Sequence, residues 1–377
     1  MELILYEPAR IAADVVRFWR ERIAAQDPAL ALTRSPEWFE MMLASQPRGG
    51  VVAAFRDDAG RLKAVLPVIF REWVLRGRLA GRDGVRRTLL TAKVCGGDLL
   101  EESLTADELA WAWQQFVQQR PAVDAFWLDH VEDGPRLDLV RASCRGRAFF
   151  AHPLLSDAPH YRLKLKGVET GLRDWRSRKS LARLQTKERA LARDVGPVHV
   201  LELRQPADWV SHAAAIEALM NHAWQAKLLG HKLRMDDQRP VAERGWLRSF
   251  LLLAGERPAA FVLCYQGMGT LFYEQLGYAQ ELGRYSPGAV LLYRVIERVL
   301  DTDTPDYIDF GEGEAEYKQS LANDVVQTNG LLVVRATPAL RLTVAAARTL
   351  GRADRALRAA LRGLGLQRWI WKKLKQG

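Results

Sequence analysis

The chain has 377 residues, of which 48% are hydrophobic and 27% are charged, and its formal net charge is +10. This length predicts two or three domains, and the composition excludes a disordered or collagenous chain. The three cysteines form no CxxC pair and have no neighbouring histidine pair, so neither a zinc site nor a disulfide framework is indicated. The chain begins without signal-peptide features, and no apolar run reaches the roughly 18 residues that span a bilayer. We therefore expect a cytoplasmic protein.

The positive charge is concentrated in two segments of the chain. Residues 338–377 carry ten arginines and lysines against one aspartate, and residues 162–193 carry eleven against three acidic residues. Such segments either bind phosphates, anionic lipids or nucleic acid, or form solvated helix faces. Both interpretations stay open at this point.

Two stretches predict the same succession of elements: a helix, a group of antiparallel strands, a second helix and a further strand. In the first half these elements are expected at residues 38–44, 51–55, 62–70, 106–119 and 125–128. In the second half they are expected at residues 216–229, as three strands over 250–279, at 289–300 and at 307–310. The repetition predicts an α+β fold with two similar halves.

The predicted organisation is an N-terminal domain over residues 1–155, a C-terminal domain over 156–335 and a basic amphipathic helical tail over 336–377. The boundary is expected within residues 152–159, where two prolines, a serine and an aspartate interrupt the periodicity. A strand is expected directly afterwards, at residues 161–165.

The tail combines leucines at helical spacing with arginines, and Trp369, Ile370 and Trp371 follow near its end. This composition is typical of a helix that lies on an anionic membrane surface. The same leucines could instead dock on the protein, and the sequence favours neither alternative. A second basic helix is predicted over residues 175–193, packed by its leucines and exposing its cations.

The strongest single motif lies where a strand ending near residue 279 leads into the amphipathic helix at 289–300. Proline and small residues at a helix start leave backbone amides and the positive end of the dipole available to phosphate. The residues expected to hold a pyrophosphate are Arg284, Ser286, Pro287, Gly288 and Ala289. The simpler alternative is that they only cap the helix.

The run SPGAVLLYRVIERVL followed by YIDFGEGEAEYKQSLA resembles the C-terminal half of FemAB/CelD-like proteins of the GNAT acyltransferase superfamily. The residues that match are Pro287, Gly288, Leu291, Asp309, Phe310, Gly313, Tyr317 and Lys318. The resemblance implies two GNAT-like domains, each a mainly antiparallel sheet flanked by helices, with acyl-donor binding in the second. Of the Gln/Arg-x-x-Gly-x-Gly phosphate loop of many GNAT proteins, only Arg284 and Gly288 have plausible equivalents here.

The candidate catalytic residues are the ionisable groups of the loop at 309–318. Asp309 or Glu314 could accept a proton from an attacking hydroxyl or amine, and Lys318 could offset negative charge on the thioester oxygen. Glu274 is a further candidate because it interrupts a half-buried strand next to the donor site. The alternative is a solvated acidic loop with Lys318 in a surface ion pair.

Two other residues, His222 and Trp224, lie on the helix predicted at 216–229. Neither has a partner at a spacing that would indicate a metal site or a nucleophilic triad, and a lone helical histidine is usually structural. No metal cofactor is expected.

The leading hypothesis is an acyltransferase that moves an acyl group, with acetyl the expected one, from acetyl-CoA or another acyl-CoA. The acceptor would be a hydroxyl or amine of a cell-envelope polysaccharide or glycan precursor, with a lipid-linked glycan among the candidates. The tail would then suit peripheral contact with the inner face of the membrane.

Two rivals remain. The first is a FemAB-type transferase that takes an amino acid from aminoacyl-tRNA to a peptidoglycan precursor, and tRNA is the nucleic acid expected under that alternative. The second is a non-catalytic envelope-assembly or glycan-binding protein with a degenerate GNAT fold.

Overall fold

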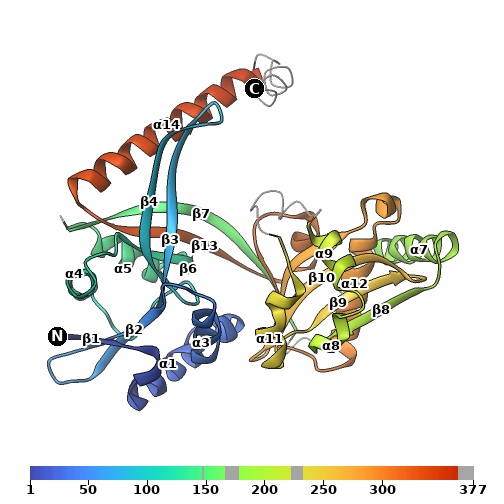
Figure 1. The fold of residues 1–377 in the computed structure, drawn as a ribbon, viewed down its shortest axis with the longest axis horizontal. Helices are drawn as coiled ribbons and strands as arrows, with labels where there is room; N and C mark the ends of the chain where they lie inside the picture. The colour runs from blue at the N-terminus through green and yellow to red at the C-terminus, as the bar shows by residue number, and fades with distance from the viewer. Residues whose placement is uncertain (147, 166–177, 222–231, 364–377) are drawn as a thin grey trace. The chain divides into compact units, whose positions relative to one another are not determined.

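A computed structural model describes residues 1–146, 148–165, 178–221 and 232–363 (Figure 1). The chain divides into two compact units. Unit 1 comprises Met1–Arg22, Met42–Ser156 and the chain from Asn329 onward, and unit 2 comprises Ile23–Met41 and Asp157–Thr328. Each unit has its own sheet and its own covering helices.

The strands of unit 1 pair mainly in antiparallel fashion, but β4 and β6 pair in parallel. Its strand order is β1 (Glu2–Tyr6), β2 (Gly50–Arg56), β3 (Leu62–Leu79), β4 (Arg82–Val94), β6 (Ala125–Glu132), β13 (Asp324–Arg335) and β7 (Phe149–Lys164). The short β5 (Leu100–Glu101) pairs with β3. Strands β7 and β13 each continue into unit 2.

The helices of unit 1 are α1 (Ala13–Ala25), α4 (Ala106–Gln119), α5 (Pro135–Ser143) and α14 (Pro338–Gly363), preceded by the 3₁₀ turn η1 (Pro8–Arg10). Helix α4 has the bounds that its periodicity predicts. It begins at a capping box in which Thr105 and Glu108 satisfy each other's backbone amides. Its buried side chains Trp113 and Phe116 pack on Phe126 of β6, which forms the centre of the unit 1 core.

The sheet of unit 2 continues from β7 through β12 (Tyr307–Glu312), β11 (Thr270–Tyr278), β10 (Arg257–Gly267) and β9 (Ser249–Ala254) to β8 (Val198–Leu203). Strands β11 and β12 are parallel, whereas β7 with β12, β11 with β10, β10 with β9 and β9 with β8 are antiparallel. The main helices are α7 (Arg178–Asp194), α9 (Ala213–Asn221) and α12 (Pro287–Asp301). The shorter elements are η2 (Pro28–Leu30), α2 (Ala31–Arg34), α3 (Pro36–Ala44), α8 (Pro206–Trp209), η3 (Met235–Gln238), α11 (Arg239–Glu243), η4 (Gln280–Tyr285) and α13 (Glu316–Leu321).

Two segments belong to a different unit from the one that the predicted domain ranges 1–155 and 156–335 give them. Ile23–Met41 belongs to unit 2, because Leu30 and Leu32 pack with Phe272. The chain from Asn329 belongs to unit 1, because Leu332 and Val334 pack in its core. Both exchanges follow from long-range burial that local periodicity does not record.

The strand expected at residues 161–165 begins earlier than predicted, since β7 runs continuously from Phe149 to Lys164. The division of the chain into the two units falls within this strand, between Ser156 and Asp157. Proline is tolerated in a strand where its missing N–H is not needed by the ladder. Pro153 and Pro159 therefore lie inside β7 and do not end it.

The tail forms α14, which lies along the long β3–β4 hairpin (Figure 1). Leu340, Val344 and Ala347 are buried against this hairpin and β13. At Gly77 of β3 an added Cβ would lie 2.7 Å from the Ala347 Cα, so the glycine allows the close approach of the helix. The described part of the tail therefore docks on unit 1, while Trp369, Ile370 and Trp371 lie outside the described residues.

Within the described part of the chain, no helix is long and apolar enough to cross a membrane. The helix expected at 216–229 is described as α9 up to Asn221, so His222 and Trp224 also lie outside the described residues. The basic helix expected at 175–193 is described from Arg178. Its leucines at 181, 184 and 191 are buried, as its pattern predicts.

Candidate functional site

Strands β11 and β12 separate shortly after they begin. They pair in parallel from Thr270–Tyr307 to Phe272–Asp309, and no later pair between them occurs in the described residues, although β11 runs on to Tyr278. On its other edge the register of β11 with β10 skips Glu274, which is the extra residue of a β-bulge. Beyond Phe272, the β12-facing edge of β11 thus has no strand partner in this part of the structure.

Asp309 lies where the two strands separate, and its carboxylate is 3% exposed. One of its oxygens accepts hydrogen bonds from His160 Nε2 and from the Gly311 amide, each at 2.7 Å. Burial alone would raise the pKa of Asp309. The hydrogen bond and charge of His160, the Gly311 amide and the charge of Arg162 outweigh burial and lower this pKa. Asp309 is therefore a firmly held carboxylate with little tendency to take up a proton.

Lys318 of α13 is half-buried beside the end of β12. Its ammonium group donates to the carbonyl oxygens of Glu312, at 2.6 Å, and Gly311, at 3.3 Å. Burial lowers the pKa of Lys318, while the charges of Asp309, Glu312 and Glu274 oppose this shift. Lys318 therefore contacts main-chain carbonyls, whereas the alternative interpretation of the sequence placed it in a surface ion pair.

The remaining acidic candidates are exposed. Glu274 projects from the bulge of β11, and its charge acts on Lys318 as well as on Cys264 and Tyr265 of β10. Glu314 lies between β12 and α13. The structure thus brings Asp309, Lys318 and Glu274 to the region where β11 and β12 separate, with Glu314 in the loop that follows.

An aromatic cluster covers the same region. The rings of Tyr273, Phe310 and Tyr317 lie about one another with centroids 5.8 to 6.2 Å apart. Burial raises the pKa of Tyr317 to about 12, and it raises the pKa of the more deeply buried Tyr273 well above its usual value. Both phenols therefore stay protonated at neutral pH. The Tyr273 hydroxyl has no hydrogen-bond partner among the described residues.

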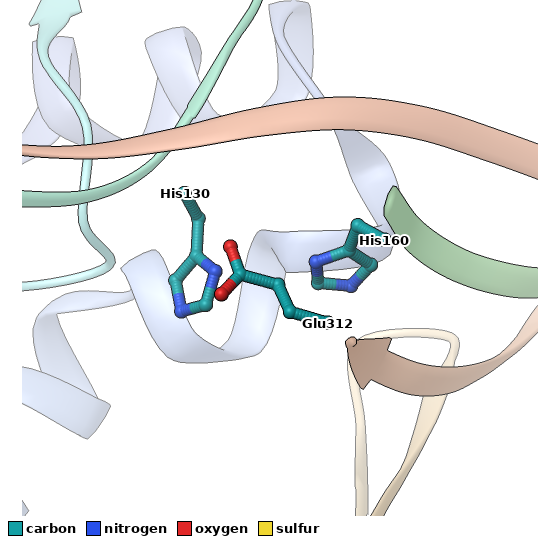
Figure 2. A group of neighbouring side chains, drawn as sticks. All are labelled: His130, His160 and Glu312. Atoms are coloured by element: carbon teal, nitrogen blue, oxygen red, sulfur yellow. The ribbon is translucent and has the colours of Figure 1, made fainter. Parts of the chain in front are cut away.

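His160 and Glu312 face each other across the antiparallel pair of β7 and β12 (Figure 2). Thr328 Oγ1 donates to Glu312 Oε1 at 2.6 Å, which orients this carboxylate. His130, drawn in the same figure, belongs to unit 1.

The second half of the candidate site is the start of α12. Ser286 takes a left-handed conformation with φ of 55° and makes no side-chain cap, and Pro287 opens the helix. Gly288 is buried, and an added Cβ would lie 3.0 Å from Leu276 Cδ2, so a larger residue here would require the Leu276 side chain to shift. Ala289 is exposed.

Two cations lie beside this helix start. The Arg284 guanidinium stacks on the Tyr285 ring, 4.6 Å from its centroid, and donates a hydrogen bond to the Tyr285 hydroxyl. Tyr285 in turn donates to Asp194 of α7 at 2.9 Å, and Lys187 of α7 donates to the Arg284 carbonyl. Helix α7 thus supplies positive charge to the uncapped start of α12 and is itself tied to α12 by the ion pair of Glu188 with Arg294, at 2.7 Å.

The sequence patterns missed two members of this region, His160 and Arg162 on β7. Arg162 is 5% exposed and pairs with Asp27 at 2.6 Å and with Asp324 at 3.8 Å. The available signal was the alternation of His160, Arg162 and Lys164 in a predicted strand, which places three polar side chains on one face. Their partners are distant in sequence, so the pattern could not name them.

The comparisons with known proteins agree with this geometry. Residues 178–319 match the family described as an acetyltransferase (GNAT) domain. No curated protein sequence matches the chain. The solved structure of FemX aligns over 91% of this chain and 100% of its own with a TM-score of 0.58 and 11% identity. A tandem GNAT protein from the clavulanic acid biosynthesis pathway aligns over 89% of this chain and 99% of its own, with a TM-score of 0.52 and 15% identity.

Residues 178–319 of unit 2 thus match a GNAT acetyltransferase domain, and the predicted resemblance to FemAB-like GNAT proteins is confirmed. The predicted α+β fold is confirmed as well, because the structures of FemX and of the tandem GNAT protein share it. At 11% and 15% identity, this likeness concerns the fold alone.

Proposed function

We propose that the protein transfers an acyl group, with acetyl the expected one, from acyl-CoA to a hydroxyl or amine of a cell-envelope polysaccharide or glycan precursor. The observation that carries the proposal is the pairing of two features in unit 2: the separation of β11 from β12, and the uncapped start of α12 that follows β11 in the chain. The separation of the two strands would accommodate the thioester of the donor, and the start of α12 would bind the pyrophosphate of its coenzyme A.

The donor end of the proposal rests on backbone amides and positive charge. The first amides of a helix have no acceptor within it, and the helix dipole adds to their attraction for phosphate. At the start of α12, Pro287 has no N–H, and the amides of Ser286 and Ala289 donate to the carbonyls of Gly283 and Ser286. Among the described residues this leaves the Gly288 amide for a phosphate, and Lys187 and Arg284 add charge beside it. This combination substitutes for the longer glycine-rich phosphate loop that the sequence lacks.

The reactive end would lie along the unpaired edge of β11. A backbone N–H beyond Phe272 would donate to the thioester oxygen, and the acceptor's oxygen or nitrogen would form a bond to the carbonyl carbon while the carbon–sulfur bond breaks. The acceptor's proton would pass to Glu274 or Glu314, which are exposed, in preference to Asp309, whose pKa is lowered. The departing thiolate would take a proton from a phenol such as Tyr317, which is half-buried and protonated.

Lys318 and Asp309 receive different roles in this scheme. Lys318 would offset the negative charge that develops on the thioester oxygen, and its lowered pKa reflects the partly dehydrated setting in which such a charge acts strongly. Asp309 would act as a positioning residue that holds the end of β12 through Gly311 and His160.

A binding experiment distinguishes this proposal from its rivals. Isothermal titration of the full chain with acetyl-CoA should show binding, and Lys187→Gln should weaken it about three- to tenfold. The matched control is Lys179→Gln, an exposed cation of the same helix, which should leave binding unchanged.

The rivals predict other results. A FemAB-type transferase would bind aminoacyl-tRNA with a steep dependence on salt and would not bind acetyl-CoA. A non-catalytic glycan-binding protein would bind neither donor. Either result would overturn the acyl-CoA proposal.

A further inference from the structure

Unit 1 contains a pocket of about 810 Å³ that the proposed reaction does not use. One face of α14 forms one side of it, and residues of β3, β7, β13 and α5 supply the rest, all within unit 1. Its volume falls in the range of roughly 300–1,000 Å³ that is usual for small-molecule sites. A ligand of substantial size therefore fits inside this unit.

The pocket is lined by five arginines and by no aspartate or glutamate. The arginines are Arg76, Arg141, Arg348, Arg352 and Arg355. Four of them, all except Arg348, form no ion pair or hydrogen bond with the described residues.

Arg348 is held in place by the pocket wall. Its Nε donates to His152 Nδ1 at 3.1 Å, and its terminal nitrogen donates to the Ala151 carbonyl at 3.0 Å. Burial, followed by the charge of Arg348, lowers the pKa of His152 to about 4, so the imidazole is neutral at pH 7 and its Nδ1 accepts this bond. The His152 ring is itself packed edge-on against Trp73, with centroids 6.5 Å apart.

The arginines of α14 also act on one another. Arg348, Arg352 and Arg355 are spaced to share one helical face, and repulsion by Arg352 contributes, after burial, to a lowered pKa of Arg348. An anion between these guanidinium groups would relieve that repulsion. Guanidinium groups bind phosphate through paired N–H donors, which is why arginine is common at phosphate sites.

The rest of the lining is apolar, with Trp73, Leu75, Leu154 and Leu331 among its members. We propose that this arginine pocket, formed by α14 and the sheet of unit 1, is a binding site for a phosphate- or diphosphate-bearing ligand. The ligand would place its phosphate among the arginines of α14 and an apolar group against the tryptophan and leucines. This site is independent of the donor site proposed in unit 2.

The test uses inorganic pyrophosphate as the probe and the full chain as the protein. The double variant Arg352→Gln/Arg355→Gln removes two exposed arginines of the pocket whose side chains have no ion-pair or hydrogen-bond partner among the described residues, so its melting temperature should match that of the parent. Its pyrophosphate affinity should fall at least about tenfold in isothermal titration, with Lys187→Gln added to the parent and to every variant so that the proposed donor site is weakened throughout. The matched control is Arg10→Gln/Arg17→Gln, which removes two exposed arginines from another part of unit 1 and should leave the affinity within about twofold.

Vesicles distinguish the two sources of such a phosphate. If the ligand is a lipid headgroup, the parent should co-sediment with phosphatidylglycerol vesicles but not with phosphatidylcholine vesicles, and the pocket variant should lose this binding. If the ligand is a free phosphorylated compound, pyrophosphate should bind and the vesicles should not. The proposal is overturned if the parent binds neither probe, or if the pocket variant and the control variant lose equal affinity.

Discussion

Replacing Asp309 should lower the free energy of unfolding of unit 2, because its carboxylate holds the candidate site together. Its carboxylate and the His160 imidazole form a buried pair, 3% and 4% exposed, with 2.7 Å between Oδ1 and Nε2. Replacement by alanine would leave His160 Nε2 and the Gly311 amide without their acceptor. At about 1–3 kcal/mol for each of these two buried donors, the expected loss of unfolding free energy is about 2–6 kcal/mol. Asp309→Asn keeps one acceptor oxygen and should cost less, about 1–2 kcal/mol.

The measurement is urea unfolding of the full chain, followed by both circular dichroism and tryptophan fluorescence, because two units need not unfold in one step. The control is Asp237→Ala, which removes an exposed carboxylate of the same unit and should cost less than about 0.5 kcal/mol. If Asp309→Ala costs less than about 1 kcal/mol, or no more than the control, then the carboxylate does not hold this region.

The pH dependence has a defined sign. The pKa of Asp309 is lower in the folded protein than in the unfolded chain, where it is about 3.9. Its contribution is therefore fully present above the unfolded pKa and is lost as the pH falls through the folded pKa. The stability difference between the parent and Asp309→Asn should be constant from pH 7 to about pH 5 and should shrink below about pH 4. A difference that shrinks between pH 7 and pH 5 would contradict the assignment.

Three further changes test other parts of the structure. Gly77→Ala should destabilise unit 1 by about 1–3 kcal/mol in urea unfolding, because its Cβ would lie 2.7 Å from the Ala347 backbone, whereas Gly146→Ala has open space and should be nearly neutral; equal effects would reject the tight docking of α14. Arg248→Met should cost about 3–5 kcal/mol, since the buried guanidinium bonds Glu202, Gln266 and two carbonyl oxygens, and a loss like that of exposed Arg239→Met would contradict this. Lys318→Ala should lower kcat/KM of acyl transfer about tenfold to a thousandfold, and an unchanged rate would limit this lysine to its carbonyl contacts.

The sequence alone determined those features that depend on neighbours in the chain. The hairpin of β2 and β3 follows from two apolar runs around Asp57 to Gly60, and helix α4 follows from its periodicity and from the cap at Thr105. The start of α12 follows from Pro287 and its amphipathic pattern. Each signal lies within about one element's length of the feature that it specifies, so periodicity and turn chemistry suffice to find it.

Only the tertiary structure decided which distant residues meet. Asp309 and His160 are 149 residues apart, and their hydrogen bond depends on the antiparallel register of β7 with β12. Strand β7 also runs through Pro153 and Pro159, whose local pattern indicates an interruption of the strand. The arginine pocket arises in the same way: the basic pattern of α14 is visible in the sequence, but docking against Gly77 and Leu75 decides which arginines line the pocket. Burial and strand pairing are long-range interactions, and no local pattern encodes the partner.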